Sequence, residues 1–215
     1  MRTALSEGNE AERSAAAREI ARWVRSATTS GENFSNIDAF LPLLTEAALT
    51  DPALCVRKTA SLALRWSNDS DAVYQIARDL KSERPERRVA AAVVLGWIAD
   101  DAATSALRIC LNQDTEIVRV FAALALIQIG HQTPLPENAA ALIAAAALNE
   151  TERVGRQLAV AALDEVPGAR DIFFAPIESA LRDGDFKGAL RLLESRSAAC
   201  HANYVDQGVV ALVPR

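Results

Sequence analysis

The chain has 215 residues and a mass of 23.1 kDa, enough for one well-packed domain or a short array of repeats. Half of the residues are hydrophobic but only 5% are aromatic, and 43 are alanine, a composition that favours closely packed helices over strands. The 23 Lys and Arg residues face 28 Asp and Glu residues, giving a net charge of −5 with both signs spread along the chain. Proteins that bind nucleic acids normally carry a basic domain or stripe, so we expect no nucleic-acid partner.

The ends of the chain and its cysteines indicate a reducing compartment. Residues 1–20 contain no apolar stretch of signal-peptide length, and no window approaches 18 uninterrupted apolar residues. We therefore expect a cytoplasmic protein with no membrane partner. Three cysteines far apart in the sequence, Cys55, Cys110 and Cys200, predict reduced thiols rather than disulfides or a zinc knuckle. Residues 212–215 spell the thrombin recognition sequence of purification tags, so we exclude 211–215 from the fold.

An internal repeat can be followed along the chain by one arginine in each copy. These arginines are Arg13, Arg57, Arg88, Arg119 and Arg156. The first copy is degenerate, and a Gly-, Ser- and Asn-rich stretch over 28–36 separates it from the rest. The three middle arginines are 31 residues apart, and the last one follows after 37. An inserted turn over 131–136 explains the longer step, because its two prolines cannot lie inside a helix.

Each period contains two helical patterns. In the first, Asp69 precedes a helix whose apolar residues Val73, Ile76, Ala77 and Leu80 have the spacing of one buried stripe. The same pattern returns over 100–111. The second helix of each period carries the arginine. Because a helix pair of this size cannot bury both apolar faces alone, we expect neighbouring pairs to stack into one continuous core.

The repeated segments resemble a known family, the HEAT repeats, and in particular the short Ala-rich type named after phycobilisome lyases. The resemblance rests on copies such as 118–130 (VRVFAALALIQIG) and 87–98 (RRVAAAVVLGWI), and it is strongest from Asp51 to Leu163. It implies that an acidic residue about six positions before each arginine binds that arginine and the arginine of the neighbouring repeat. The residues of this structural ladder are Asp51, Arg57, Arg88, Asp114, Arg119, Glu150 and Arg156. Ser82 stands where the acidic residue before Arg88 is expected, with Glu83 or Glu86 as substitutes.

The resemblance predicts an all-α fold, a right-handed α-α superhelix of the HEAT-like or armadillo type with about five helix pairs. We expect a single repeat domain over residues 1–210. Within it, 1–35 form N-terminal capping helices, 36–166 the core repeats, and 167–205 a C-terminal repeat or cap.

A partner-binding surface is predicted along the second helices. Counting 100° per residue from each repeat arginine places the core near positions +3, +7 and +10 and the opposite side near +1, +5 and +8. In the two central repeats this opposite side is apolar, which indicates either burial by the neighbouring repeats or an apolar stripe on the concave face. The second interpretation predicts that a peptide or helix of another protein binds in the groove, with Lys58 and Arg65 selecting acidic flanking residues. The predicted contacts are Lys58, Arg65, Trp66, Val89, Val93, Trp97, Val120, Leu124 and Ile127.

No motif for chemistry stands out, so we expect no enzyme, no catalytic or metal-binding residue and no cofactor. Two histidines are too few for most catalytic or metal sites, and the chain has no His-Glu dipeptide, the motif of HEAT-fold iron hydroxylases. The HEAT resemblance leaves other functions open: a phycobilin lyase or chromophore chaperone and, less favoured, a HEAT-like DNA glycosylase that would use Trp23, Trp66 and Trp97. An apolar stripe would also suit a homodimer.

Overall fold

The computed structural model describes residues 1–30, 39–149 and 153–192, and all the regular structure in these ranges is helical. The predicted all-α class is therefore confirmed. The chain forms two compact units, Met1–Pro134 and Leu135–Arg215, which we describe separately. The expected single repeat domain over 1–210 stays a prediction, and the predicted tag sequence over 211–215 lies outside the described residues, as does Cys200.

The first unit consists of short first helices that alternate with longer second helices. Its elements are α1 (Arg2–Glu7), α2 (Glu10–Ser30), α3 (Leu41–Thr50), α4 (Leu54–Ser67), α5 (Ser70–Asp79), α6 (Pro85–Ile98), the 3₁₀ turn η1 (Asp101–Ala103), α7 (Thr104–Gln113) and α8 (Glu116–Ile129). Within each pair, α1 packs on α2, α3 on α4, α5 on α6 and α7 on α8. Between pairs, α2 packs on α4, α4 on α6 and α6 on α8.

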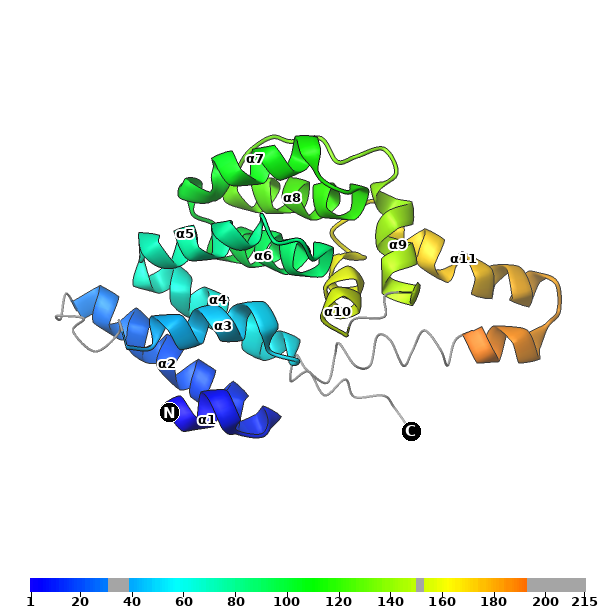
Figure 1. Ribbon diagram of the computed structural model, residues 1–215. Helices are drawn as coiled ribbons and strands as arrows, with labels where there is room; N and C mark the ends of the chain where they lie inside the picture. The colour runs from blue at the N-terminus through cyan, green and yellow to red at the C-terminus, as the bar shows by residue number, and fades with distance from the viewer. Residues whose placement is uncertain (31–38, 150–152, 193–215) are drawn as a thin grey trace. The chain divides into compact units, whose positions relative to one another are not determined.

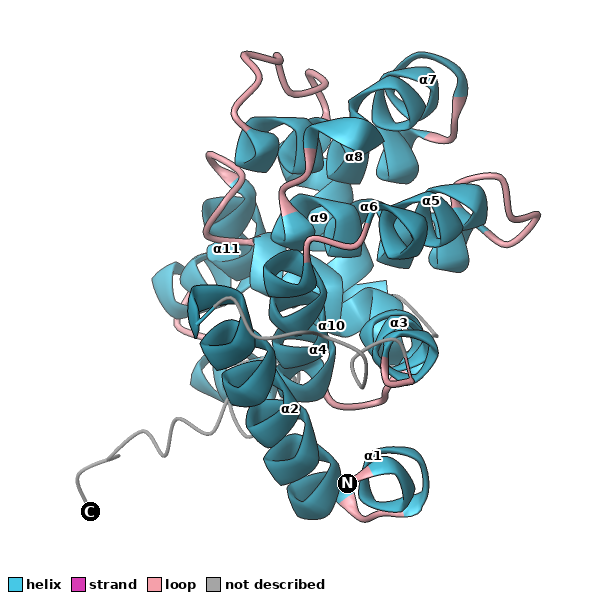
Figure 2. Cartoon of the chain, turned by 90° about the vertical axis from the view of Figure 1, so that its left-hand side faces the viewer, coloured by secondary structure: helices cyan, strands magenta, loops and turns pink. Residues whose placement is uncertain are grey.

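These contacts arrange the first unit in two layers. Figure 2 shows α1, α3, α5 and α7 stacked along one side and the second helices α2, α4, α6 and α8 stacked along the other. The same order runs from bottom to top in Figure 1. The stacking of successive pairs, which the repeat predicted, is thus present over four pairs.

The second unit is smaller. In it α9 (Ala139–Asn149) packs against α10 (Arg153–Ala162) and α11 (Ala169–Arg182), and a further helical segment covers 186–192. Phe173 of α11 is fully buried and makes an edge-to-face contact with Phe174. The predicted turn over 131–136 is confirmed, since this segment has no helix and precedes α9.

The helix ends follow local rules that the sequence displays. The Asp69 side chain accepts a hydrogen bond from the Ala72 N–H at 2.9 Å and so caps α5, as predicted. At the end of α8, Gly130 has a φ of 111°, and the N–H groups of Gly130 and His131 donate to the carbonyls of Ile127 and Leu126. This pair of bonds is a Schellman motif, which ends the helix and satisfies its last carbonyl groups.

The second helices α6 and α8 approach each other closely at Gly96. A Cβ atom at this position would lie 2.9 Å from the Cα of Ala125, closer than real Cβ atoms come to backbone. The glycine therefore permits close packing of these two helices.

Candidate functional site

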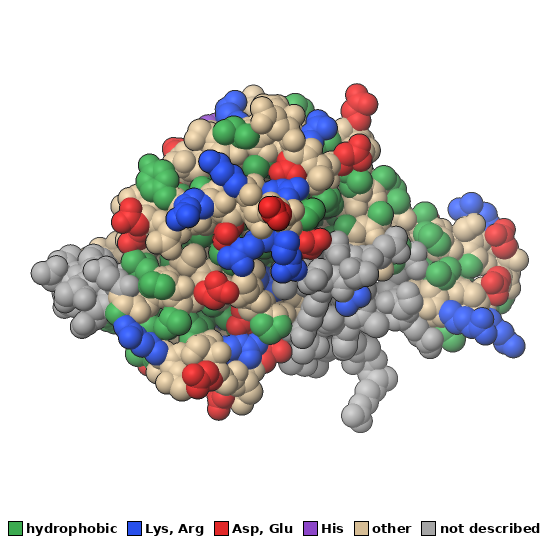
Figure 3. All heavy atoms as spheres, viewed as in Figure 1, with side chains coloured by type: hydrophobic (Ala, Val, Ile, Leu, Met, Phe, Trp, Pro, Cys, Tyr) green, Lys and Arg blue, Asp and Glu red, His purple; other side chains and the backbone are tan. Residues whose placement is uncertain are grey.

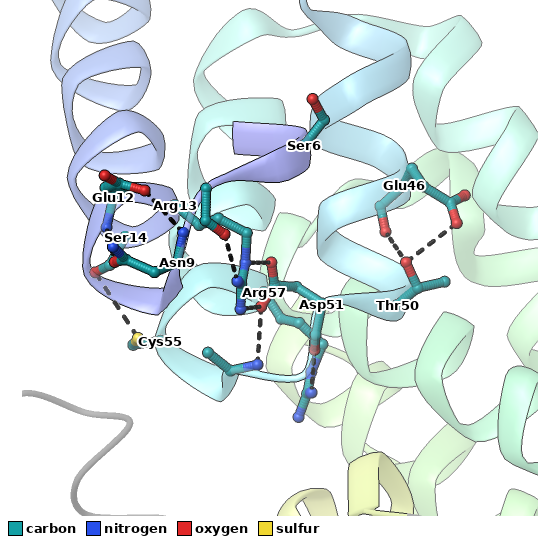
Figure 4. Close-up of polar contacts among 12 residues, drawn as sticks. Ser6, Asn9, Glu12, Arg13, Ser14, Glu46, Thr50, Asp51, Cys55 and Arg57 are labelled. Atoms are coloured by element: carbon teal, nitrogen blue, oxygen red, sulfur yellow. Dashed lines mark hydrogen bonds and ion pairs between the residues drawn. The ribbon is translucent and has the colours of Figure 1, made fainter. Parts of the chain in front are cut away.

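The repeat arginines form a ladder that joins successive helix pairs. Arg13 on α2 donates from Nε and Nη2 to the carboxylate of Asp51, at 2.7 and 3.1 Å, and from Nη1 to the carbonyl of Gly8 (Figure 4). Asp51 also accepts a hydrogen bond from the Ala53 N–H at 2.8 Å. Asp51 is 6% exposed, so its carboxylate connects α2 to the start of α4 inside the protein.

The same arrangement recurs between Arg88 and Asp114, which belong to successive helix pairs. Arg88 on α6 donates to both oxygens of Asp114, with its shortest contacts at 2.8 Å, and its Nη1 donates to the carbonyls of Ser82 and Glu83. Burial alone would raise the pKa of Asp114, but the hydrogen bonds from Arg88 and from the Thr115 N–H outweigh it and lower that pKa. Asp114 is therefore held as a carboxylate.

The ladder agrees with the prediction in its contact to the neighbouring repeat and differs in the contact to the arginine of the same repeat. Each described carboxylate binds the arginine of the preceding pair, while the arginine of its own repeat binds backbone carbonyls. Arg57 donates to the carbonyl of Asp51 at 2.6 Å, and Arg119 donates to that of Leu111 at 2.9 Å. Arg88 donates to the backbone carbonyl of Ser82, which takes the place of the predicted carboxylates of Glu83 and Glu86. In the second unit Arg156 is half-buried, and its predicted partner Glu150 lies outside the described residues.

The repeat arginines give the four stacked second helices a common numbering, and equivalent positions define the surface that we call the second-helix face. Counting from Arg13, Arg57, Arg88 and Arg119, position +5 is Arg18, Leu62, Val93 and Leu124. Position +9 is Arg22, Trp66, Trp97 and Gln128. The face comprises the accessible side chains around these positions of α2, α4, α6 and α8.

Three of the nine predicted partner contacts are core residues instead. Val89, Val120 and Leu124 are 5%, 0% and 7% exposed, so they have almost no surface to offer a partner. Their interpretation as surface residues is wrong, because a helix between neighbours is covered over most of its circumference. The remaining predicted contacts keep accessible surface: Lys58, Arg65 and Ile127 are exposed, and Trp66, Val93 and Trp97 are half-buried.

The prediction missed a row of arginines on the first helix of the face. Arg18, Arg22 and Arg25 on α2 are all exposed, and the guanidinium of Arg25 lies 5.3 Å from the centre of the Trp66 ring on α4. Their spacing of four and three residues, which aligns side chains on one side of a helix, was the available signal. The degenerate first copy of the repeat obscured it.

The opposite layer of the first unit has a different charge pattern. In Figure 3, which shows this layer of first helices, acidic and basic side chains are interspersed. Its exposed residues include Asp71 and Arg78 on α5 and Arg108 on α7. The row of exposed cations on α2 and α4 lies on the second-helix face, which this view does not show.

A hollow of about 400 Å³ on the first unit lies between α5 and α7 and is lined by Ala77, Leu80, Ile109 and the buried Cys110, among others. Burial raises the pKa of the Cys110 thiol, which disfavours a reactive thiolate. Across 1–30, 39–149 and 153–192, no group of three His, Cys, Asp or Glu side chains is placed to hold a metal ion.

No model of a known protein family matches the chain, and no curated protein is recognisably similar in sequence. Within the described residues no helix is long and apolar enough to cross a membrane.

Proposed function

We propose that this protein is a non-enzymatic binding module, built as a HEAT-like solenoid, whose second-helix face holds a segment of another protein. The observation that carries the proposal is the accessible side of four stacked second helices, where Trp66, Trp97 and Ile127 remain exposed or half-exposed beside a row of cations. Tryptophan and arginine are the residues most enriched at binding hot spots.

The arrangement of these groups supports a protein ligand. Apolar patches with a polar rim are typical of interaction surfaces, and here the apolar residues of α6 and α8 adjoin the charged residues of α2 and α4. Trp66 and Trp97 occupy the same position in successive stacked helices. A row of side chains on parallel helices suits an extended or helical segment laid across them.

The proposal is tested by two matched substitutions on opposite layers. Ile127→Asp places a charge on the second-helix face, at a residue that is 43% exposed, and Ile109→Asp does the same on α7, at 56% exposure. Both variants should keep the helical circular dichroism of the wild type. A partner retained from native lysate should be lost from the Ile127 variant and kept by the Ile109 variant, and its purified form should show the same difference by calorimetry.

Equal capture by both variants would contradict this site. Light scattering of the wild type separates the homodimer from the heteromeric complex, since a second copy of the chain would occupy the same face. A dimer that Ile127→Asp dissociates would replace the partner protein as the ligand of this face.

A further inference from the structure

Five positive side chains gather on adjoining parts of the second-helix face. Arg18, Arg22 and Arg25 stand at successive turns of α2, and Lys58 and Arg65 stand two turns apart on α4. All five are exposed, and α2 packs directly on α4. With a rise of about 1.5 Å per residue, each row extends about 10 Å, and the two rows lie about 8–10 Å apart.

Among the described residues none of these five positive side chains is in an ion pair, and α4 contains no acidic residue. Of the acidic residues on α2, Glu12 is engaged at the helix start by the Asn9 N–H at 2.8 Å. Glu19 is exposed and stands three residues before Arg22, so it is the acidic neighbour of this row on α2, and three of the exposed charged side chains around it are positive.

Like charges spaced three or four residues apart repel each other, so this arrangement has a cost in the isolated chain. The repulsion is relieved when an anionic ligand binds. This cluster of positive charge stands on a chain whose net charge is −5. A concentrated positive field on an acidic protein steers negatively charged partners to one place.

The face changes character along the stack. Where α2 presents Arg18 and Arg22, α6 presents Val93 and Trp97 at the same positions, and α8 adds the exposed Ile127. Trp66 lies at the transition, with Arg25 against its ring. The ligand that complements both ends is a polypeptide with acidic and apolar parts, whereas a nucleic acid would leave the apolar end uncovered.

We infer that the segment bound on the second-helix face is acidic at one end and apolar at the other, with its carboxylates over α2 and α4 and its apolar side chains over α6 and α8. This inference rests on the proposed function. Three helix-to-helix steps of about 8–10 Å make about 25–30 Å, which about eight or nine extended residues span. The segment is therefore a short linear motif.

The test selects ligands without assuming a sequence. A library of random peptides longer than this span is selected on the full chain, and a selected peptide is then synthesised and its affinity measured by fluorescence anisotropy. Selected sequences should be enriched in Asp and Glu followed or preceded by aromatic or aliphatic residues. Their affinity should fall as salt concentration rises, because the cations are exposed.

Two charge-reversed variants locate the binding. Arg18→Glu with Arg65→Glu should weaken the peptide about tenfold or more, because repulsion replaces attraction at two points. Arg78→Glu with Arg108→Glu makes the same charge change on the opposite layer and should change the affinity by less than about twofold. Ile127→Asp should also weaken binding.

The possible outcomes distinguish a failure of this inference from a failure of the proposed function. The selected peptides could lack acidic residues and bind equally to both charge-reversed variants, yet still depend on Ile127. That result overturns the inference and leaves the proposed function standing. Peptides indifferent to every one of these variants overturn both. A labelled single-stranded oligonucleotide is measured in the same assay. If it binds more tightly than any selected peptide and fails to bind the Arg18→Glu, Arg65→Glu variant, the ligand of this face is a nucleic acid and not an acidic segment.

Discussion

The ladder contact between Arg88 and Asp114 should contribute measurably to stability, and the substitution Asp114→Asn tests it. The two side chains are only 13% and 12% exposed, and Arg88 donates to both carboxylate oxygens. Hydrogen bonds to charged groups contribute about 1.5–3 kcal/mol each. Asparagine retains one acceptor oxygen, and Arg88 keeps its bonds to Ser82 and Glu83, so we expect a loss of about 2 kcal/mol in the free energy of unfolding at neutral pH.

The pH dependence of this loss identifies its cause. Folding lowers the pKa of Asp114 from its ordinary value of 3.8, so the stabilisation is complete above the pKa of the unfolded chain and disappears as pH falls through the lower folded value. The stability difference between wild type and Asp114→Asn should thus be constant from about pH 7 to 5 and shrink below about pH 4.

Urea unfolding followed by circular dichroism measures both quantities. The matched control is Glu86→Gln, since Glu86 makes only a long contact of 3.9 Å with the exposed Arg84. Contacts of this kind contribute about 0–1 kcal/mol, so the control should change stability by less than about 0.5 kcal/mol. Equal effects of the two substitutions, or a loss at Asp114 that persists undiminished in acid, would refute the argument from buried charge-assisted bonds.

Three further predictions concern packing, backbone and thiol chemistry. Gly96→Ala should lower the free energy of unfolding, measured in urea, by about 1 kcal/mol. Overpacking against Ala125 costs about 1–3 kcal/mol, which exceeds the gain of about 1 kcal/mol in helix propensity. A more stable variant would show that α8 moves to accommodate the methyl group. Ala99→Gly should raise the melting temperature, with a gain of about 0.5–1 kcal/mol, because Ala99 ends α6 at a φ of 54°; a lower melting temperature would contradict this. Cys110 should react with iodoacetamide far more slowly in the native chain than in urea, since burial raises the pKa of its thiol; equal rates by peptide mass spectrometry would show that the helix pair opens readily.

Local patterns in the sequence predicted several helices of the first unit, including the helix after Asp69 and the arginine-bearing second helices. The cap at Asp69, the stop at Gly130 and the prolines after it act over a few residues, so their effect does not depend on the rest of the fold. The repeat of about 31 residues likewise predicted that helix pairs stack, because each pair carries more apolar surface than it can bury alone.

The binding surface was predictable only in part. Lys58 and Arg65 are exposed as expected, because charged side chains at the outer positions of an amphipathic helix remain in water. Val120 and Ile127 occupy the same predicted side of α8, yet one is fully buried and the other is 43% exposed. A helical wheel assigns directions, whereas burial depends on which neighbouring helix covers each turn.

The sequence by itself determined which segments are helical, where they stop, and that their apolar faces must pack against neighbouring pairs, because these properties follow from interactions within a few residues and from the total apolar surface. The tertiary structure alone decided that Asp51 binds Arg13, 38 residues before it, and that the arginines of α2 continue the row begun by Lys58 and Arg65. Both depend on the register between stacked helices. That register is set by packing across helix pairs, such as the close approach at Gly96, and no local pattern in the chain encodes it.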